Sequence, residues 1–278
     1  MSIANFKPNI WSARLQANLD KALVFGGLVT RDWEGEIREM GDSVRINRPN
    51  NLTVNDYAGT VSYESPTSAQ TILTIDQQKY VAFKVSDIDQ AQANVDLIDA
   101  YANRAAYALA DAVDQHLASL YTAAGAGTVT LDLTAATPAV YDAFVEARKL
   151  LNKQNVPSNG RWVVVSPDIE ASLLKDDKFV QSTDQGDNIR MTGRIGGIAG
   201  FDVYVSNNVP TVTDAATGAV YHKAVFGYND AIAFAGQFTK IEVIRGESSF
   251  DDLFRSLYLF GAKVIEANGL GVIDARVA

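Results

Sequence analysis

The side chains that could carry acid–base or metal chemistry in this chain are few. Its 278 residues include no cysteine and two histidines, His116 and His222. Metal sites and catalytic bases combine histidine with further ligands at fixed spacing, as in HExxH, and neither histidine has such a neighbour. His116 falls within a helical pattern, and His222 stands beside Lys223 before a strand pattern. The sequence therefore predicts packed or strand-end positions for both histidines, without a catalytic role.

Two pairs of adjacent carboxylates are the other candidates for chemistry. Asp176–Asp177 and Asp251–Asp252 have the oxygens that a metal ion or an acid–base pair needs. Adjacent carboxylates in loops are more often solvated surface groups. A hydrolase that uses these acids stays open as an alternative, although no nucleophile motif such as GxSxG occurs. It predicts turnover that is lost when Asp176 or Asp177 is replaced.

A glycine-rich stretch, TGRIGGIAGFDVYVS, has the composition of a dinucleotide-binding loop but not its context. That fingerprint follows a strand and opens a helix, whereas this stretch precedes a strand. We predict a turn at Gly193, Gly196, Gly197 and Gly200. No Walker loop occurs elsewhere, so no cofactor and no metal site are expected.

The elements that would position such chemistry form an α/β pattern over residues 137–238. An amphipathic helix is expected after Thr137 as N-cap, with Pro138 at its first position. RWVVVS is predicted as a buried strand, and a short helix begins at Pro167. The alternating strand GFDVYVSNNVP ends at Pro210, and AVFGYNDAIAFA adds a further strand or two. This unit is well patterned, yet it has almost none of the residues that catalysis requires.

The strongest helical signal covers residues 94–121, a length of about 42 Å for an α-helix. Its apolar residues recur at steps of three or four: Ile98, Ala102, Ala105, Leu109, Val113, Leu117 and Leu120. The many alanines favour close approach to a sheet. We expect that sheet to consist of the closing strands, TKIEVIRG and FRSLYLFGAKVIEANGLGVIDARV.

Two further strand patterns predict a long finger. Residues 43–49 alternate polar and apolar, and residues 71–85, TILTIDQQKYVAFKV, are predicted as one strand of roughly 50 Å. Both ends of the second strand have an apolar face, whereas its middle, DQQK, is polar. Residues 50–70 between the strands are rich in Asn, Ser, Thr and Gly. Two strands alone in water are marginally stable, so the finger needs another surface to lie on.

The composition restricts the partners of this chain. It is 47% hydrophobic and 21% charged, and its net charge is -9. Affinity for nucleic acid comes largely from Lys and Arg side chains that release counterions, so we expect DNA to be contacted only weakly. No window of about twenty apolar residues occurs, so no membrane span is expected.

Three stretches resemble, in this order and spacing, the major capsid (coat) proteins of tailed double-stranded-DNA bacteriophages. They are NIWSARLQANLDKALVFGGLVTRDWEGEIREMGDSVRINRP, KVSDIDQAQANVDLIDAYANRAAYALADAVDQHLASLY and GFDVYVSNNVP. The resemblance covers nearly the whole chain and implies the α+β tailed-phage capsid fold. It divides the chain into an N-terminal arm (1–41), an extended two-stranded loop (42–85), a peripheral domain with a long spine helix (86–124 and 239–278) and an axial α/β domain (125–238).

The resemblance implies a structural protein of the virion with no enzymatic activity. Its copies would assemble in the host cytoplasm into pentamers and hexamers, which form an icosahedral shell around phage double-stranded DNA. A portal with a packaging motor is then expected. The chain reaches its arm helix by Trp11, which leaves no room for a guiding leader and favours a separate scaffolding protein. The alternative is a cellular nanocompartment shell of the same fold, similar to an encapsulin, which neighbouring genes would distinguish.

The resemblance also implies a partner for the finger. We expect one end of residues 71–85 to join the core of its own domain and the other end to lie on a neighbouring subunit. Many weak contacts in a closed lattice then stabilise the shell. The candidate inter-subunit contacts lie in the arm and near the base of the finger: Trp11, Arg31, Glu34, Arg45 and Arg48.

Overall fold

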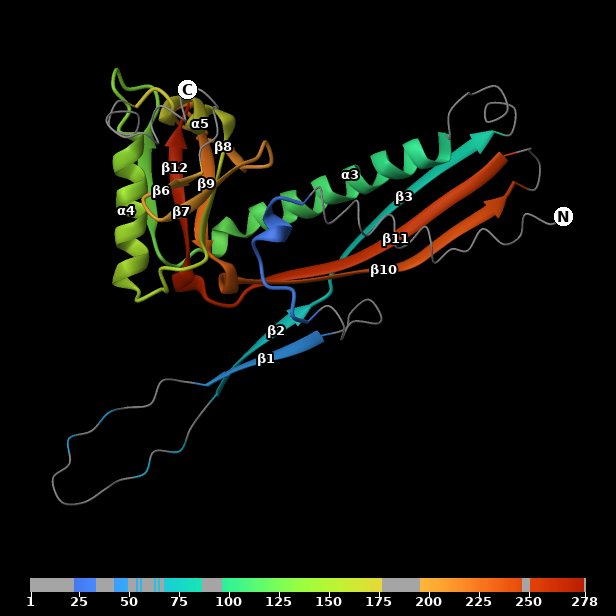
Figure 1. Ribbon diagram of the computed structural model, residues 1–278, viewed down its shortest axis with the longest axis horizontal. Coiled ribbons are helices and arrows are strands. Elements are labelled where there is room, and N and C mark those ends of the chain that lie inside the picture. Colours follow the sequence, from blue (N-terminus) through green and yellow to red (C-terminus); the bar gives the residue numbers. More distant parts are fainter. Residues whose placement is uncertain are drawn as a thin grey trace.

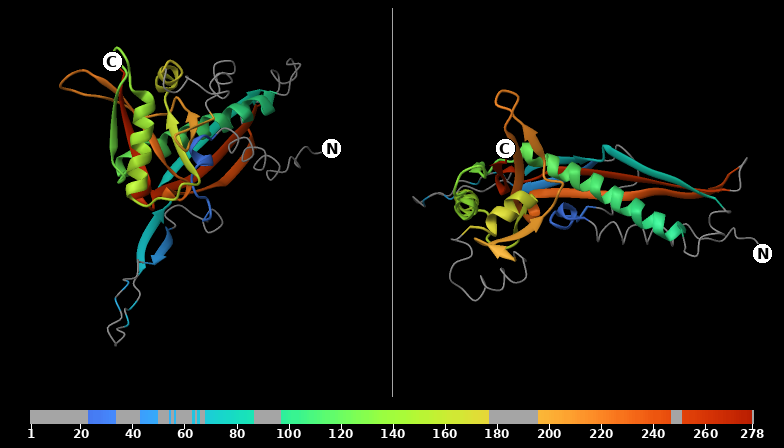
Figure 2. Two further views of the ribbon diagram at one scale, coloured as in Figure 1. Left: turned by 60° about the vertical axis from the view of Figure 1, so that its left-hand side comes forward. Right: turned by 90° about the horizontal axis from the view of Figure 1, so that it is seen from above.

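A computed structural model of the chain describes residues 23–33, 43–49, 54, 56, 63, 65, 68–86, 97–176, 196–246 and 251–277. The strands form a large sheet flanked by helices, a long sheet with one helix along it, and a hairpin that projects from the junction of the two (Figure 1). The left-hand view of Figure 2 also shows the hairpin pointing away from both sheets. In the described residues, no helix is both long and apolar enough to cross a membrane.

The large sheet has the strand order β4-β12-β9-β5-β7-β6, and β8 pairs with β9 beside this path. Its strands are β4 (Thr128–Asp132), β5 (Arg161–Val165), β6 (Gly197–Ile198), β7 (Phe201–Val205), β8 (Thr211–Thr213), β9 (Val220–Tyr228) and β12 (Leu270–Arg276). β12 runs parallel to β4, and β5 runs parallel to β7, whereas the other pairs are antiparallel. The short helices η4 (Asn229–Ala231) and η5 (Ala267–Gly269) follow β9 and precede β12. β5 is buried along its whole length, as the apolar run Trp162–Val165 predicts, and Arg161 at its start is buried too.

Alternate side chains of β5 enter two different cores, because successive residues of a strand point to opposite faces. Val163 and Val165 pack in the core that contains buried residues of α4 (Val140–Lys153) and α5 (Pro167–Leu173). Trp162 and Val164 pack in the core that contains residues of η1 (Phe25–Gly27) and α3 (Leu97–Ser119). β5 therefore connects the two halves of the molecule.

The start of α4 differs from the prediction. Its N-cap residue is Ala139, which makes no side-chain hydrogen bond, so the predicted Thr137 cap is wrong. The Asp176 carboxylate instead accepts a hydrogen bond from the Tyr141 amide at 3.0 Å. A negative charge at a helix N-terminus is favourable, so Asp176 stabilises α4 and has a structural role. These residues are 35 positions apart, so no local pattern reveals the contact.

The long sheet has the order β10-β11-β3 and is antiparallel throughout. Its strands are β3 (Gln77–Ser86), β10 (Ile232–Arg245) and β11 (Asp251–Val264). α3 lies along one face of this sheet and continues into η3 (Leu120–Ala123) (Figure 1). The helix predicted over 94–121 is confirmed for 97–119, while residues 94–96 lie outside the described residues. Leu109, Val113 and Leu117 pack in one core with Tyr258 and Phe260 of β11, which confirms a sheet of closing strands beneath the helix.

Two of the predicted segments each include a strand that belongs to another part of the fold. β3 pairs with β11 along its whole length, so residues 77–86 belong to the long sheet and not to the extended loop of 42–85. β12 pairs with β4 and β9, so residues 270–276 belong to the large sheet rather than to the segment 239–278 beneath α3. Apolar alternation indicates a strand, but it does not indicate which distant strand becomes its neighbour.

The predicted glycine turn is confirmed at Gly200, whereas Gly197 belongs to a strand. Gly197 and Ile198 form β6, which pairs antiparallel with the start of β7. The turn between them places Gly200 at a φ of 84°, where glycine has no steric cost. Gly193 lies outside the described residues.

Candidate assembly surfaces

The projecting hairpin consists of β1 (Ser43–Pro49) and β2 (Ser68–Thr74), paired antiparallel from Ser43↔Thr74 to Pro49↔Ser68. Its base packs on the body of the same subunit. The buried side chains of the hairpin base and of the long sheet form one cluster: Val44, Ile46, Leu73, Ile75, Ala233, Ala235 and Leu259. The sheet contributes two alanines to this cluster, and such small residues let the hairpin approach closely.

Gly261 of β11 lies at the point of closest approach. A Cβ atom at this position would be 2.3 Å from the Thr74 carbonyl oxygen and 3.1 Å from the Ile75 Cα. Both neighbours are backbone atoms and cannot rotate away as a side chain can. Glycine is therefore required here for the end of β2 to lie on the long sheet.

The continuous strand predicted over 71–85 is wrong. β2 ends at Thr74 and β3 begins at Gln77, and Ile75 and Asp76 belong to neither strand. Leu73 and Ile75 have no exposed surface, and both are buried by the same chain. The expectation that this end lies on a neighbouring subunit is therefore wrong as well. The polar residues that begin at Asp76 mark the place where the chain passes from the hairpin to the long sheet.

The connection between β1 and β2 has large apolar side chains in solvent. Val54 is 96% exposed and Tyr63 is 94% exposed. A hydrophobic group that stays exposed in the subunit marks an interaction surface when several occur together. The base of the hairpin is thus covered by its own subunit, whereas the described side chains of Val54 and Tyr63 are not.

A second group of exposed apolar residues lies on the long sheet, opposite the face that α3 covers. Ile244 faces Leu253 across the β10–β11 pair, and Tyr80 lies on the same face of β3. Ion pairs occur at the same end of the sheet: Lys84–Asp251 at 3.7 Å, Arg245–Asp252 at 2.9 Å, and Arg255–Glu242. An apolar centre beside charged groups is typical of protein interfaces. The acidic pair Asp251–Asp252 thus begins β11 and forms ion pairs, and is not a loop.

The predicted contact residues do not form one cluster in the part of the chain that the structure describes. The Arg31 guanidinium lies 5.4 Å from the centre of the Phe234 ring of its own subunit. Arg45 is exposed on β1, opposite Ile72. Arg48 pairs through its backbone in the same strand. The Arg48 side chain lies outside the description, and so do Trp11 and Glu34.

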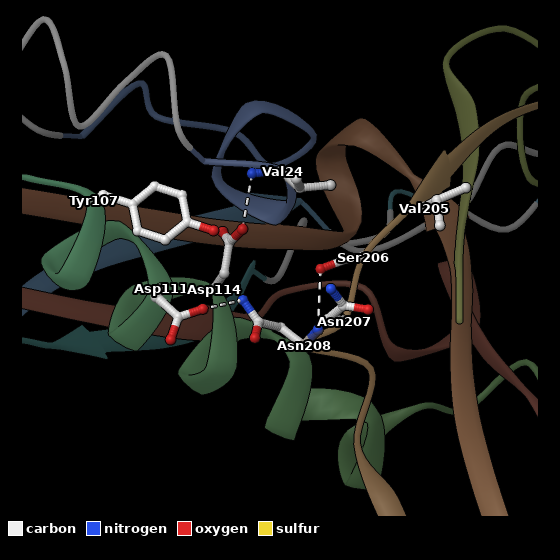
Figure 3. Close-up of a pocket in the computed structure, with 8 residues that line it drawn as sticks. All are labelled: Val24, Tyr107, Asp111, Asp114, Val205, Ser206, Asn207 and Asn208. Carbon is white, nitrogen blue, oxygen red and sulfur yellow. Dashed lines mark hydrogen bonds between the residues drawn. The ribbon is translucent and has the colours of Figure 1, made fainter. Parts of the chain in front are cut away.

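A pocket of about 190 Å³ lies where α3, η1 and the loop after β7 meet (Figure 3). Asp114, only 2% exposed, accepts hydrogen bonds from the Val24 amide at 2.8 Å and the Gly26 amide at 3.3 Å. Burial raises the pKa of Asp114, and the backbone hydrogen bonds oppose that rise. Asp111 accepts from the Asn208 side-chain amide at 2.7 Å. The carboxylates therefore join segments of the chain.

His222 lies beside Ser166 and Asp168, and no sequence motif predicts this group. Its Nδ1 atom is 2.8 Å from Ser166 Oγ and 3.4 Å from Asp168 Oδ2. A catalytic triad uses one ring nitrogen for the serine and the other for the acid, whereas here one nitrogen faces both. Ser166 is also buried, and its Oγ accepts a hydrogen bond from Ile169 N at the start of α5. The group therefore stabilises the helix and does not support the hydrolase alternative.

His116 has the packed position predicted for it. Its ring is edge-on to Phe260, with 5.5 Å between the ring centres, and burial lowers its pKa. Across the described residues, no group of three or more His, Asp or Glu side chains could hold a metal ion.

Comparison with known proteins identifies the family. The family model described as "Phage capsid protein" matches residues 70–273. The chain is similar to a solved structure from Mycobacterium phage Che8, with 29% identity, 90% of each chain covered and a TM-score of 0.71. The capsid of the cyanophage P-SCSP1u has the same fold, with 18% identity, 92% of this chain and 89% of that chain covered, and a TM-score of 0.72. No curated protein sequence matches the chain.

A third structure, the capsid of Ralstonia phage GP4, also has this fold, with 15% identity, 90% and 87% of the two chains covered, and a TM-score of 0.68. These matches favour a phage shell over the cellular nanocompartment alternative. They also account for a well-packed molecule in which Val54, Tyr63, Ile244 and Leu253 stay exposed while Asp114 and Ser166 are buried in structural roles. The chain therefore belongs to the phage capsid protein family, and it is a structural protein of the virion shell.

Proposed function

We propose that copies of this chain assemble as pentamers and hexamers into the icosahedral shell of a tailed phage. The observation that carries this proposal is the hairpin. Its base is held by a buried cluster of its own subunit, while Val54 and Tyr63 between its strands are almost fully exposed. A subunit that holds apolar side chains away from its own core presents them to another copy.

Each part of the fold has a role in this proposal. Of the predicted arm (1–41), Leu23, Phe25, Leu28 and Val29 pack in the core with α3, so we assign the residues before Leu23 to the arm. The β1–β2 hairpin is the extended loop. α3 and the long sheet form the peripheral domain, and the large sheet with α4 and α5 forms the axial domain. The side chains of β5 pack in the cores on both of its faces, which supports a rigid placement of the two domains relative to each other.

The far end of the hairpin contacts the long sheet of a neighbouring copy. The exposed face around Tyr80, Ile244 and Leu253 suits this contact, because it pairs apolar surface with apolar surface. Each contact is small, but every subunit in a closed lattice both gives and receives one. Repeated over the shell, such contacts reach an avidity that no single one has.

The remaining partners are a separate scaffolding protein, a portal and the packaged DNA. A net charge of -9 supports weak contact with DNA, because phosphate groups and carboxylates repel one another. The proposal is tested by electron microscopy and light scattering of the purified chain, with and without its scaffolding protein. Closed particles or capsomers are expected. A strictly monomeric chain at high concentration in both conditions would contradict it.

Replacing Val54 and Tyr63 with serine is expected to lower the yield of particles at least tenfold. Burial of each side chain against a neighbour contributes about 1.5–3 kcal/mol. The melting temperature of the free subunit should stay almost unchanged, because both side chains are exposed there. Sedimentation separates particles from subunits. Val145→Ser on α4, which is 43% exposed, is the control, and equal losses in both variants would remove the assignment.

Charge reversal at Arg45 is expected to reduce particle yield more than it reduces subunit stability. The side chain is exposed on β1, and exposed ion pairs contribute less than about 1 kcal/mol each, so folding should change little. Yield is compared by sedimentation and stability by thermal melting. Lys149→Glu on α4, which removes an exposed ion pair with Glu146, is the matched control. A larger effect of Arg45→Glu on melting than on yield would refute the prediction.

A further inference from the structure

The segment before the hairpin is held to α3 by one buried carboxylate. Val24 is the N-cap of η1, and it has no side-chain cap of its own. The Asp114 oxygens occupy that place: Oδ2 accepts from the Val24 amide and Oδ1 from the Gly26 amide. Burying a charge is costly unless it is hydrogen-bonded, so these two contacts are what makes Asp114 tolerable at this position.

A second carboxylate, one helical turn earlier, holds a different segment. Asp111 Oδ1 accepts from the Asn208 side chain at 2.7 Å, and Oδ2 accepts from Gln115 at 3.0 Å. Figure 3 shows both carboxylates on the same side of α3, with Val24 and Asn208 on either side of the pocket. All four carboxylate oxygens have donors from this chain. The pocket is therefore a joint between three segments rather than a site for a cation.

Apolar contacts alone do not give the N-terminal segment a unique direction. Leu23, Phe25 and Leu28 are buried in the core beneath α3, but hydrophobic burial is non-directional. Hydrogen bonds have a preferred geometry, and the two from Asp114 fix the backbone at Val24 and Gly26. These hydrogen bonds therefore fix the backbone at the start of the described segment 23–33.

We propose that Asp114 is a positioning residue for shell assembly: it fixes the backbone at Val24 and Gly26, close to where the N-terminal arm joins the subunit. Asp111 holds the loop after β7 independently. The assembly half of this inference rests on the proposed function, in which the arm contacts neighbouring copies. The anchoring half concerns the free subunit and stands on the contacts of Asp114 alone.

The test compares Asp114→Asn with Asp111→Asn in the full chain. Asparagine keeps the shape but has one acceptor oxygen instead of two, and its NH₂ group would face an amide N–H. Amide exchange is followed by mass spectrometry in peptides that cover residues 23–28 and 206–210. For Asp114→Asn we expect amide exchange in 23–28 to become about tenfold faster, because the loss of one hydrogen bond destabilises the segment by about that factor. Exchange in 206–210 should not change. For Asp111→Asn we expect the opposite.

Particle yield supplies the assembly readout. Well below the melting temperature of each variant, Asp114→Asn is expected to lower the yield of closed particles several-fold or to broaden their diameters. Unchanged exchange in 23–28, or equal loosening of both segments by both variants, overturns the anchoring role. Normal particles despite a loosened segment overturn the assembly role. If Asp114→Asn does not fold, Asp114→Ala removes the acceptors without adding a competing donor.

A parent chain that forms no particles under any condition would refute the proposed function and the assembly role with it. The exchange comparison would still decide whether Asp114 anchors the segment, so the two failures are distinguishable.

Discussion

Replacing Gly261 with alanine is expected to abolish particle formation and to destabilise the subunit by about 2–3 kcal/mol, the usual cost of overpacking a core. The added Cβ would lie 2.3 Å from the Thr74 carbonyl oxygen, far inside van der Waals contact. The obstructing atoms belong to the backbone of Thr74 and Ile75 at the end of β2, so the hairpin itself has to move. Denaturant unfolding measures the free energy, and electron microscopy measures the particles.

Gly196→Ala is the matched control, because a Cβ there would meet no atom within 4 Å. It should leave both stability and assembly close to those of the parent chain. Normal particles from Gly261→Ala would show that the base of the hairpin does not need its observed position. A loss of stability without a loss of particles would show that the neighbouring copy, rather than the subunit, sets the direction of the hairpin.

Replacing Trp162 with alanine is expected to destabilise the subunit by about 3–5 kcal/mol, as removal of a large buried aromatic side chain does. Trp162 is 1% exposed on β5, and its ring packs edge-on against Phe25 with 6.5 Å between ring centres. The cavity would lie between the large sheet and η1. We therefore expect the N-terminal segment to loosen before the rest of the fold, as faster amide exchange at Leu28 would show.

Trp162→Phe separates packing from hydrogen bonding. The Trp162 Nε1 atom is buried without a hydrogen-bond partner among the described residues. Phenylalanine removes this unsatisfied donor and keeps most of the ring volume, so it should cost less than half as much as alanine. Tyr80→Ala, at a side chain that is 77% exposed, should change stability by less than about 0.5 kcal/mol. Equal losses for Trp162→Phe and Trp162→Ala would contradict this account.

Local sequence patterns were sufficient to predict those helices and strands whose structure depends on adjacent residues. α3 repeats apolar residues at helical spacing, and β5 contains the apolar run Trp162–Val165 between Arg161 and Ser166, so both were predictable from a few adjacent positions. The same holds for α5, whose cap Ser166 and first residue Pro167 are neighbours in sequence. The resemblance to phage coat proteins then supplied the arrangement of these elements.

The remaining features depend on residues that are far apart in the chain. Asp114 binds the Val24 amide across 90 positions, and Asp176 binds the Tyr141 amide across 35. A lone aspartate has no spacing signal that distinguishes such an anchor from a solvated charge. The break at Ile75 was missed for a related reason. The apolar residues on both sides of the polar DQQK stretch have the same parity, so they read as one strand. Only the pairing of β1 with β2 and of β3 with β11 shows that two sheets are involved.

The way in which the hairpin is held has a mechanical consequence. Among the described residues, the buried contacts of the hairpin lie toward its base, so the two strands can pivot together about the close contact of Thr74 with Gly261. A tilt of about 5° at that contact would move the far end of a strand of roughly 23 Å by about 2 Å. The same chain can thus contact neighbours at slightly different angles without a change in its body. A closed, curved shell built from identical subunits needs such a range of angles.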